Sequence, residues 1–282
     1  MILTGKAKVA GVMGWPVSHS RSPRLHGYWL EKHRIDGAYI PMAVPPEKLE
    51  YALRALPALG LRGTNITVPH KEAALRVCDT VDPLARRIGA VNTIVVGTDG
   101  HLEGSNTDAF GLIENLRAGS AWQPGDGPAV ILGAGGAARS ACVALIDAGV
   151  ETIRIVNRTR ARAEDLAGAM APACGAVAWD EREEALDGAA LVVNTTTLGM
   201  TGQPPLEIRL DSLPGKATVY DIVYVPLETG LLAAARARGN PVVDGLGMLL
   251  HQARPGFESW FGVRPEVDGD LRNFMLGDLR KA

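Results

Sequence analysis

Apolar runs alternate with amphipathic stretches along the first hundred residues of the chain, as strands and helices do in α/β proteins. The runs predict strands over 8–14, 38–44, 63–68 and 90–96. Apolar residues at helical spacing between them predict helices over 23–33 and 47–59, the first with Leu25, Trp29 and Leu30 on one face. Alternation of this kind predicts a mostly parallel sheet with helices on its faces.

A stretch rich in Gly and Pro at 119–128 interrupts this pattern and predicts a linker. A helix is expected just before this stretch, over 110–116. A second series follows the stretch, with helices expected over 137–148 and 163–170 and strands over 129–132, 152–156, 176–179, 191–194, 218–223 and 241–244. Such a series predicts a doubly wound nucleotide-binding domain of the Rossmann type. An amphipathic helix expected over 246–261 would return to the first domain. The predicted fold class is therefore α/β.

Length and composition narrow the function without naming it. A chain of 282 residues has room for two domains. Its net charge is −2, so nothing suggests a basic surface that would bind nucleic acid or an anionic membrane. We therefore expect no nucleic-acid partner and no membrane partner. The N-terminus lacks the apolar stretch of a secretion signal, which predicts a cytoplasmic protein. The three Cys and six His show no metal-ligand spacing, so no metal is expected.

A glycine-rich loop stands between an expected strand and an expected helix, as Gly133-Ala134-Gly135-Gly136-Ala137-Ala138. Gly133 permits a tight turn, Gly135 lets the backbone approach a pyrophosphate, and Ala138 is small enough for close packing of the helix. The N-terminus of a helix attracts phosphate groups. The loop therefore predicts a dinucleotide site.

The segment Asn157-Arg158-Thr159-Arg160-Ala161-Arg162 indicates which dinucleotide binds. NAD enzymes place an acidic residue about 20 residues after the loop, where it binds the ribose 2′-hydroxyl. Planar guanidinium groups suit a 2′-phosphate instead, and Thr159 adds a hydroxyl donor. A solvated basic turn is the alternative. At this position we favour phosphate binding by Arg158 and Arg162, with Arg160 facing solvent, and predict NADP as the cofactor.

Three polar fragments carry candidate substrate residues. Ser20 and Ser22 precede Pro23, and their hydroxyls could bind a carboxylate, although Ser22 could instead cap the following helix. Lys71 follows a strand and a turn at Pro69, and Asp108 precedes an apolar helix. If Lys71 and Asp108 meet across one cleft, they can hold the amine charged and move a proton.

These fragments belong to nine ordered motifs that cover nearly the whole chain and resemble those of shikimate dehydrogenases. They are His19–Pro23, Asn65–Lys71, Gly89–Thr93, Gly104–Asp108, Gly133–Ala137, Asn157–Thr159, Asn194–Met200, Tyr220–Pro226 and Asp244–Gln252. Two of them alone, the glycine-rich loop and Asn157–Thr159, are also similar to the nucleotide domain of glutamyl-tRNA reductase.

The resemblance implies a role for each matching residue. It implies that Lys71 and Asp108 are the catalytic pair and that Ser20 and Ser22, with Tyr224 close by, hold the shikimate carboxylate. The residues expected on the ring hydroxyls are Thr67, Asn92, Asp108 and Gln252. The residues expected near the nicotinamide half of NADP are Asn194, Ile222, Gly245 and Met248. The implied domains are a substrate-binding and catalytic domain, 1–108 joined by 246–282, and an NADP-binding domain, 109–245.

The implied reaction is the reversible reduction of 3-dehydroshikimate to shikimate by NADPH, in a monomer or homodimer. A quinate/shikimate dehydrogenase that uses NAD is one alternative, which the Arg-Thr turn disfavours. A non-catalytic relative that binds shikimate is another, disfavoured by the presence of both Lys71 and Asp108. A paralogue acting on an amino analogue of shikimate is a third.

Overall fold

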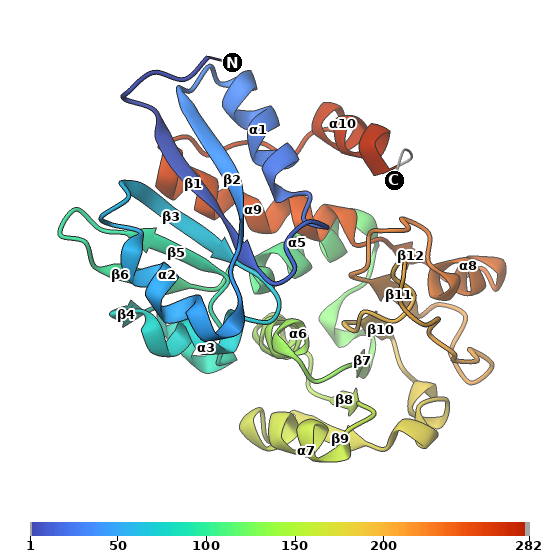
Figure 1. Cartoon of the computed structure of the whole chain (residues 1–282). Coiled ribbons are helices and arrows are strands. Elements are labelled where there is room, and N and C mark those ends of the chain that lie inside the picture. Colours follow the sequence, from blue (N-terminus) through green and yellow to red (C-terminus); the bar gives the residue numbers. More distant parts are fainter. Residues whose placement is uncertain (1, 280–282) are drawn as a thin grey trace. The chain divides into compact units, whose positions relative to one another are not determined.

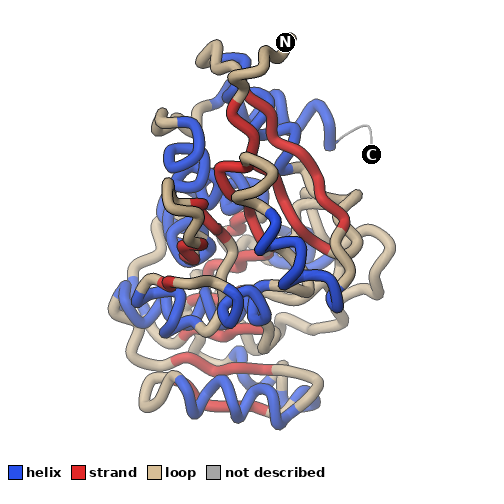
Figure 2. Tube along the Cα trace, turned by 60° about the vertical axis from the view of Figure 1, so that its left-hand side comes forward, coloured by secondary structure: helices blue, strands red, loops and turns tan. Residues whose placement is uncertain are grey.

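Two six-stranded sheets organise the chain in this computed structural model, which describes residues 2–279 (Figure 1). Within those residues the first unit runs to Thr107 and resumes at Gln252, and the second unit is Asp108–His251. Helices flank the strands throughout (Figure 2), as the alternating pattern predicts. Every helix in residues 2–279 is too short or too polar to cross a lipid bilayer.

The first sheet has the strand order β2-β1-β3-β5-β6-β4. Its strands are β1 (Lys8–Gly14), β2 (Gly37–Ala43), β3 (Leu61–Ile66), β4 (Thr80–Val81), β5 (Thr93–Val96) and β6 (Leu102–Ser105). β1 is parallel to β2 and β3, and β4 is parallel to β6. β5 runs antiparallel to both β3 and β6. The mostly parallel sheet is confirmed, but β6 and its hairpin with β5 were not predicted.

Helices cover both faces of the first sheet. On one face lie α2 (Leu49–Ala55), α3 (Lys71–Val77) and α4 (Pro83–Ile88), packed on strand residues that include Met13, Ile66 and Ile94. On the other lie α1 (Ser22–Lys32) and the end of α9 (Leu246–Phe261), where the His26 ring stacks on Tyr39 among Trp29, Phe257 and Trp260. The last helix, α10 (Gly269–Leu279), contacts α1.

The C-terminal helix returns to the first unit, as predicted. The indole nitrogen of Trp260, in α9, donates a hydrogen bond to the backbone oxygen of Ile94 in β5, 3.0 Å away. Gly63 of β3 makes room for this indole, because a Cβ atom there would collide with the Trp260 ring. Its φ of 149° is also one that residues with side chains rarely adopt. Glycine at this position therefore permits the helix to close against the sheet.

The second sheet is wholly parallel, in the order β12-β11-β10-β7-β8-β9. Its strands are β7 (Ala129–Leu132), β8 (Ile153–Val156), β9 (Cys174–Val177), β10 (Leu191–Asn194), β11 (Thr218–Asp221) and β12 (Val242–Val243). Read from β9, this is the 3-2-1-4-5-6 order of the dinucleotide-binding fold, so the Rossmann prediction is confirmed. The order reverses between β7 and β10, and dinucleotides bind at the carboxyl ends of strands at that point.

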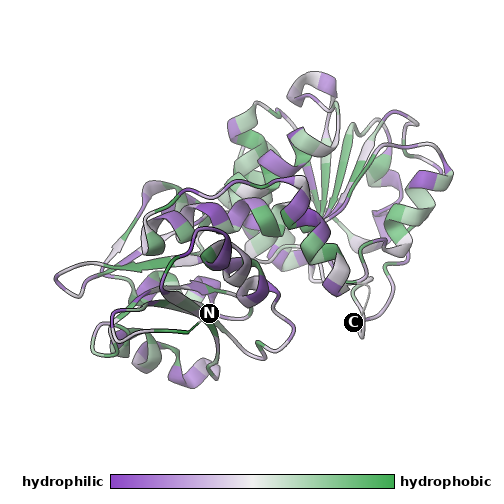
Figure 3. Cartoon of the chain, turned by 90° about the horizontal axis from the view of Figure 1, so that it is seen from above, coloured by the Kyte–Doolittle hydropathy of each residue, from purple (hydrophilic) through white to green (hydrophobic). Residues whose placement is uncertain are grey.

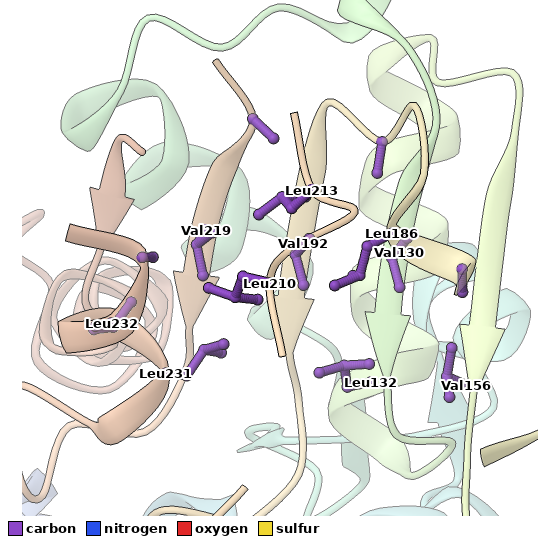
Figure 4. Close-up of a cluster of buried hydrophobic side chains, with 14 residues drawn as sticks. Val130, Leu132, Val156, Leu186, Val192, Leu210, Leu213, Val219, Leu231 and Leu232 are labelled. Carbon is purple, nitrogen blue, oxygen red and sulfur yellow. The ribbon is translucent and has the colours of Figure 1, made fainter. Parts of the chain in front are cut away.

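The second unit holds a core on each face of its sheet. Figure 4 shows one of them, where Val130, Val192 and Val219 from three neighbouring strands meet Leu210 and Leu232. The strands of this sheet are strongly apolar (Figure 3), because both faces are covered. The helices of the unit are α5 (Asp108–Gly119), α6 (Gly136–Ala148), α7 (Arg160–Ala169), α8 (Gly230–Ala237) and the start of α9. The described 3-10 turns of the chain are Pro46–Lys48, Pro124–Asp126, Trp179–Glu181 and Glu184–Leu186.

Several helix boundaries differ from the predictions. The helix expected over 47–59 begins later, at Leu49, after a 3-10 turn, and ends at Ala55. Pro57 has no backbone N–H to donate to the oxygen of Leu53, so the helical hydrogen bonds stop before it. The helix expected over 163–170 begins earlier, at Arg160. The pattern missed α3, α4 and α8, each of eight residues or fewer, as well as α10. Helices of two turns repeat an apolar spacing too few times to be recognised.

Candidate functional site

The loop between β1 and α1 carries Ser20 and Ser22. The Ser20 backbone nitrogen donates to the oxygen of Val17 (3.0 Å), and the Ser20 hydroxyl accepts from the Ser22 nitrogen (3.3 Å). Helix α1 begins at Ser22, with Pro23 next, and the residue at its N-cap position is Arg21, whose side chain makes no capping bond. The capping alternative for Ser22 is therefore wrong. Its buried hydroxyl instead forms a hydrogen bond with Tyr39.

A buried chain of polar side chains continues from Tyr39 through the first unit. The Tyr39 hydroxyl donates to Oδ1 of Asn65 (2.6 Å), and Nδ2 of Asn65 donates to the backbone oxygen of Asn92 (3.1 Å). Nδ2 of Asn92 lies within hydrogen-bond distance of Oε1 of Gln252, at 3.5 Å. Burial raises the pKa of Tyr39 well above its ordinary value, so the phenol stays protonated and able to donate. Three predicted substrate residues, Ser22, Asn92 and Gln252, are thus linked.

Tyr39 and Asn65 were not singled out from the sequence. Asn65 opens the motif that ends at Lys71, so its motif position could have indicated it. Tyr39 lies in the middle of β2, where a lone aromatic residue looks like core packing. Only the fold brings its hydroxyl to the end of the Asn65 side chain.

The Asn92 amide is also tied to the residues that precede Asp108. Its Oδ1 accepts from the backbone nitrogen of Thr107 (2.8 Å) and from the Thr93 hydroxyl (2.9 Å), while its Nδ2 donates to the Thr107 hydroxyl (3.0 Å). The strand pair β5–β6 sets this geometry, because it brings the ends of the two strands together. Thr107 directly precedes Asp108, so these bonds fix the backbone from which Asp108 extends.

Lys71 and Thr67 share a turn after β3. The Thr67 nitrogen donates to the oxygen of Met13 and the His70 nitrogen to the oxygen of Thr67, both at 2.9 Å. A ring nitrogen of His70 also lies 2.7 Å from the oxygen of Val44. Lys71 is the first residue of α3, and its backbone oxygen accepts from Val91 (2.9 Å). These hydrogen bonds hold the turn that precedes Lys71 in place.

Asp108 is the first residue of α5, with 4% of its surface exposed, and belongs to the second unit. Lys71 belongs to the first unit. Their pairing stays a prediction. Tyr224 also belongs to the second unit, whereas Ser20 and Ser22 lie in the first, so its place beside the substrate carboxylate stays a prediction as well.

The glycine-rich loop has the geometry that a dinucleotide requires. Gly133 has a φ of 115°, and a Cβ there would lie 2.6 Å from Oγ1 of Thr195. Gly135 precedes α6 without a side-chain cap, and no atom lies within 4 Å of where its Cβ would stand. Helix α6 begins at Gly136, and its first N–H groups, those of Gly136 and Ala137, therefore lack a side-chain cap. Ala134 and Ala138 are buried, which fixes the loop on the sheet.

The turn after β8 and the first turn of α7 expose four polar side chains, Arg158, Thr159, Arg160 and Arg162. Within residues 2–279, Arg158 and Arg162 form no ion pair, whereas Arg160 pairs with Glu164 at 2.8 Å. Thr159 precedes α7 but its hydroxyl caps no backbone N–H. Asn157 fixes the turn, since its Nδ2 donates to the oxygen of Thr159 (2.8 Å). Two guanidinium groups and one hydroxyl are thus available to an anion.

A pocket of about 260 Å³ adjoins Arg158 within the second unit. Trp179, Arg182 and Leu198 are among the residues that line it. The Arg182 guanidinium lies 5.3 Å above the Trp179 ring and donates to the backbone oxygens of Trp179 (3.0 Å) and Glu207 (2.9 Å). The pocket offers flat apolar and cationic surfaces next to the predicted phosphate-binding turn.

The residues predicted near the nicotinamide come together at the ends of β10 and β11. The Ile222 nitrogen donates to the backbone oxygen of Asn194, 3.1 Å away. Gly245 is packed so tightly against Ile222 that a Cβ atom would collide with the Ile222 backbone. Met248 follows in the first turn of α9 and is buried. The four residues therefore lie on neighbouring segments of one unit.

Three family models match successive regions of this chain. The family model described as the shikimate dehydrogenase substrate binding domain matches residues 12–94. The model for shikimate/quinate 5-dehydrogenase matches residues 123–200, and the model for the shikimate 5′-dehydrogenase C-terminal domain matches residues 245–270. The matched regions contain most of the predicted site residues.

Individual relatives match over almost their whole length. A shikimate dehydrogenase (NADP+) from Paramagnetospirillum magneticum is 63% identical over 97% of this chain and 100% of the relative. A Thermus thermophilus shikimate 5-dehydrogenase, solved with NADP(H) and shikimate, is 38% identical with a TM-score of 0.84, covering 97% of this chain and 99% of that one. A Corynebacterium glutamicum quinate dehydrogenase, solved with NAD, is 31% identical with a TM-score of 0.89, covering 96% and 99%.

Proposed function

This chain belongs to the shikimate dehydrogenase family, and we propose that it catalyses the reversible reduction of 3-dehydroshikimate to shikimate by NADPH. It is an NADP-dependent oxidoreductase acting on a CH-OH group. This reaction belongs to the shikimate pathway, which leads to chorismate and the aromatic amino acids. The observation that carries the proposal is the buried chain of hydrogen bonds that links Ser22, Asn92 and Gln252 in one unit.

The second unit fits NADP. Gly133 and Gly135 leave no side chain in the path of a pyrophosphate, and the uncapped start of α6 supplies N–H donors. Arg158, Thr159 and Arg162 would hold the 2′-phosphate, because their polar groups are exposed and not used by α7. Asn194, Ile222, Gly245 and Met248 would border the nicotinamide half. When bound, NADPH supplies the hydride.

The first unit would bind the substrate. The Ser20 and Ser22 hydroxyls would bind its carboxylate, together with Tyr224. Thr67, Asn92, Asp108 and Gln252 would bind the ring hydroxyls. The network behind Asn92 holds the amide in one orientation, so that it meets the substrate already arranged. A fixed arrangement lowers the entropy cost of binding a small polyhydroxy acid.

Lys71 and Asp108 would carry out the proton transfer. In the reducing direction, the Lys71 ammonium would stabilise the negative charge that develops on the reacting oxygen of the substrate and donate a proton to it. Asp108 would orient that ammonium and accept a hydrogen bond from a substrate hydroxyl. In the oxidising direction the same groups would act in reverse, with neutral Lys71 accepting the proton.

One steady-state assay tests this function. Initial rates are measured for shikimate and quinate, each with NADP and with NAD. We expect the highest kcat/KM for shikimate with NADP. A higher kcat/KM for quinate with NAD would favour instead the activity named for the Corynebacterium glutamicum relative. The cationic turn at Arg158 and Arg162 disfavours that second candidate.

We also propose that the protein works in the cytoplasm as a monomer or homodimer and binds no nucleic acid. Its net charge of −2 provides no general attraction to phosphate backbones. Light scattering of the purified protein would give the oligomeric state, and a trimer or tetramer would contradict the proposal.

A further inference from the structure

Asn194 and Asp221 end two neighbouring strands of the second sheet. They lie opposite each other in the parallel register of β10 and β11, and both side chains are fully buried. Nδ2 of Asn194 donates to Oδ1 of Asp221 across 2.9 Å. β10 borders the point where the strand order reverses, so this pair lies at the strand ends where dinucleotides bind in such sheets.

The carboxylate determines which way the Asn194 amide points. An ionised carboxylate only accepts hydrogen bonds, so the NH₂ group of Asn194 must face Asp221. The amide oxygen is then directed at Thr196, whose backbone nitrogen (3.0 Å) and hydroxyl (2.7 Å) both donate to it. With the amide reversed, its NH₂ group would face the Thr196 N–H donor and its oxygen would face a carboxylate. Both contacts would be repulsive.

The loop that follows β10 folds around this one amide. Nδ2 of Asn194 also donates to the backbone oxygen of Leu198 (3.2 Å). The Leu198 nitrogen in turn donates to the Thr196 hydroxyl (3.0 Å). The conformation of residues 195–198 therefore depends on the orientation of the Asn194 side chain.

The same loop forms one wall of the dinucleotide turn. The Thr195 hydroxyl donates to the backbone oxygen of Leu132, the residue before Gly133, at 2.7 Å. A Cβ atom on Gly133 would stand 2.6 Å from Oγ1 of Thr195 and 3.2 Å from Cγ2 of Thr196. A shift of this loop would thus change the space beside Gly133, where the pyrophosphate is proposed to bind.

Asp221 has a second set of bonds that does not involve the loop. Its Oδ2 accepts from the Thr229 hydroxyl (2.7 Å) and its Oδ1 from the Val223 nitrogen (3.0 Å). Thr229 caps α8, because its hydroxyl also accepts from the Leu232 nitrogen (3.3 Å). The bond to Thr229 stabilises α8, and the bond to Asn194 shapes the loop. The bond to Thr229 can therefore be removed by a substitution at Thr229 that leaves the bond to Asn194 in place.

We propose that Asp221 is a positioning residue for the cofactor, whose carboxylate orients the Asn194 amide and thereby holds residues 195–198 against the Gly133 turn. The inference rests on the proposed NADPH site. The isosteric substitution Asp221→Asn keeps the size of the side chain but replaces an obligate acceptor by a group that can accept or donate. Thr196 and Val223 still orient the two amides, but the bond from Asn194 is no longer charge-assisted, so residues 195–198 are held less firmly against the Gly133 turn.

The test compares Asp221→Asn with Thr229→Val, which removes the other bond to the same carboxylate. NADPH dissociation constants are measured by fluorescence titration, and melting temperatures by calorimetry. We expect Asp221→Asn to raise the Kd for NADPH about tenfold or more, the size expected for a hydrogen bond to a charged group, with no fall in melting temperature. We expect Thr229→Val to lower the melting temperature, through loss of the helix cap, and to leave the Kd within about twofold.

A second variant keeps the proposal testable if Asp221→Asn does not fold. Thr196→Val removes the hydroxyl that donates to the Asn194 oxygen while keeping the shape of the side chain, and should also weaken NADPH binding. A Kd for NADPH within about twofold of wild type in either Asp221→Asn or Thr196→Val would overturn the proposal. An equal rise of this Kd in Thr229→Val would overturn it too. A wild-type protein that fails to bind NADPH would contradict the proposed function as well.

Discussion

The Tyr39 hydroxyl, buried at the centre of the first unit, donates a 2.6 Å hydrogen bond to Oδ1 of Asn65. Through this bond the aromatic cluster under α1 supports the amide network that ends at Asn92 and Gln252. The core of the unit and its proposed substrate site therefore share one side chain. A change at Tyr39 should affect both stability and substrate binding.

Tyr39→Phe keeps the ring that stacks on His26 and removes only the hydroxyl. Oδ1 of Asn65 then loses its partner in a buried site, which costs about 1–3 kcal/mol of unfolding free energy. The KM for shikimate should rise several-fold while the KM for NADP changes little. Chemical denaturation and steady-state kinetics measure the two effects. Tyr28→Phe, the same change at a half-buried position of α1 whose ring packs on Phe274, is the control and should show neither.

Lys71→Ala removes the proposed proton donor at the start of α3. Loss of an acid–base group lowers the rate by about 10²–10⁴, so kcat should fall by that order while the KM for shikimate changes much less. Steady-state rates with saturating NADP check this. Lys48→Ala, at an exposed position in the same unit, should keep wild-type rates. A kcat for Lys71→Ala within a few-fold of wild type would exclude Lys71 from the chemistry.

Arg158→Asp should remove most of the preference for NADPH over NADH. The variant loses a charge-assisted hydrogen bond of about 1.5–3 kcal/mol to the 2′-phosphate, so the KM for NADPH should rise about 10- to 100-fold. Arg160→Asp changes the net charge equally, but its guanidinium already pairs with Glu164. The ratio of kcat/KM values for NADPH and NADH should therefore change far more in Arg158→Asp. Equal changes in both variants would refute the assignment.

Asp221 should make stability fall as the pH rises. Burial raises the pKa of this carboxyl to about 6, although Thr229, Val223 and Asn194 donate hydrogen bonds to it. In the unfolded chain its pKa is about 3.9, so between these values the folded protein binds more protons. The contribution of Asp221 to the unfolding free energy therefore declines through this window, by about 3 kcal/mol in total.

The Asp221→Asn variant isolates this effect, since it lacks the titrating group. Its unfolding free energy relative to wild type should increase between pH 4 and pH 7, as measured by denaturant titration at each pH. A difference that stays constant over this range would show that the Asp221 carboxyl does not titrate within it.

The sequence allowed the strands and the order of the motifs to be predicted, because these depend on local patterns. Strands 8–14, 129–132 and 191–194 match β1, β7 and β10, each an apolar run bounded by glycine or polar residues. The hairpin of β5 and β6 escaped prediction because β6, Leu102–Ser105, has only one large apolar side chain. Alternation in so short a strand carries little information.

The candidate site was predicted as a set of residues, not as a set of contacts. Ser22, Asn92 and Gln252 could be named from their motifs, but Tyr39, which joins them through Asn65, carries no motif signal. The bond between Asn194 and Asp221 depends on the register of β10 and β11, strands separated by more than twenty residues of chain. Such a register is set by packing of the whole sheet rather than by neighbouring residues.

The first unit is made from both ends of the chain, since α9 closes it through Trp260 and Gly63. During synthesis, its sheet emerges from the ribosome long before the aromatic residues that cover it. The second unit is continuous and has all its strands available earlier. The N-terminal segment must therefore wait, with the part of its sheet that α9 covers still exposed, until translation is nearly finished.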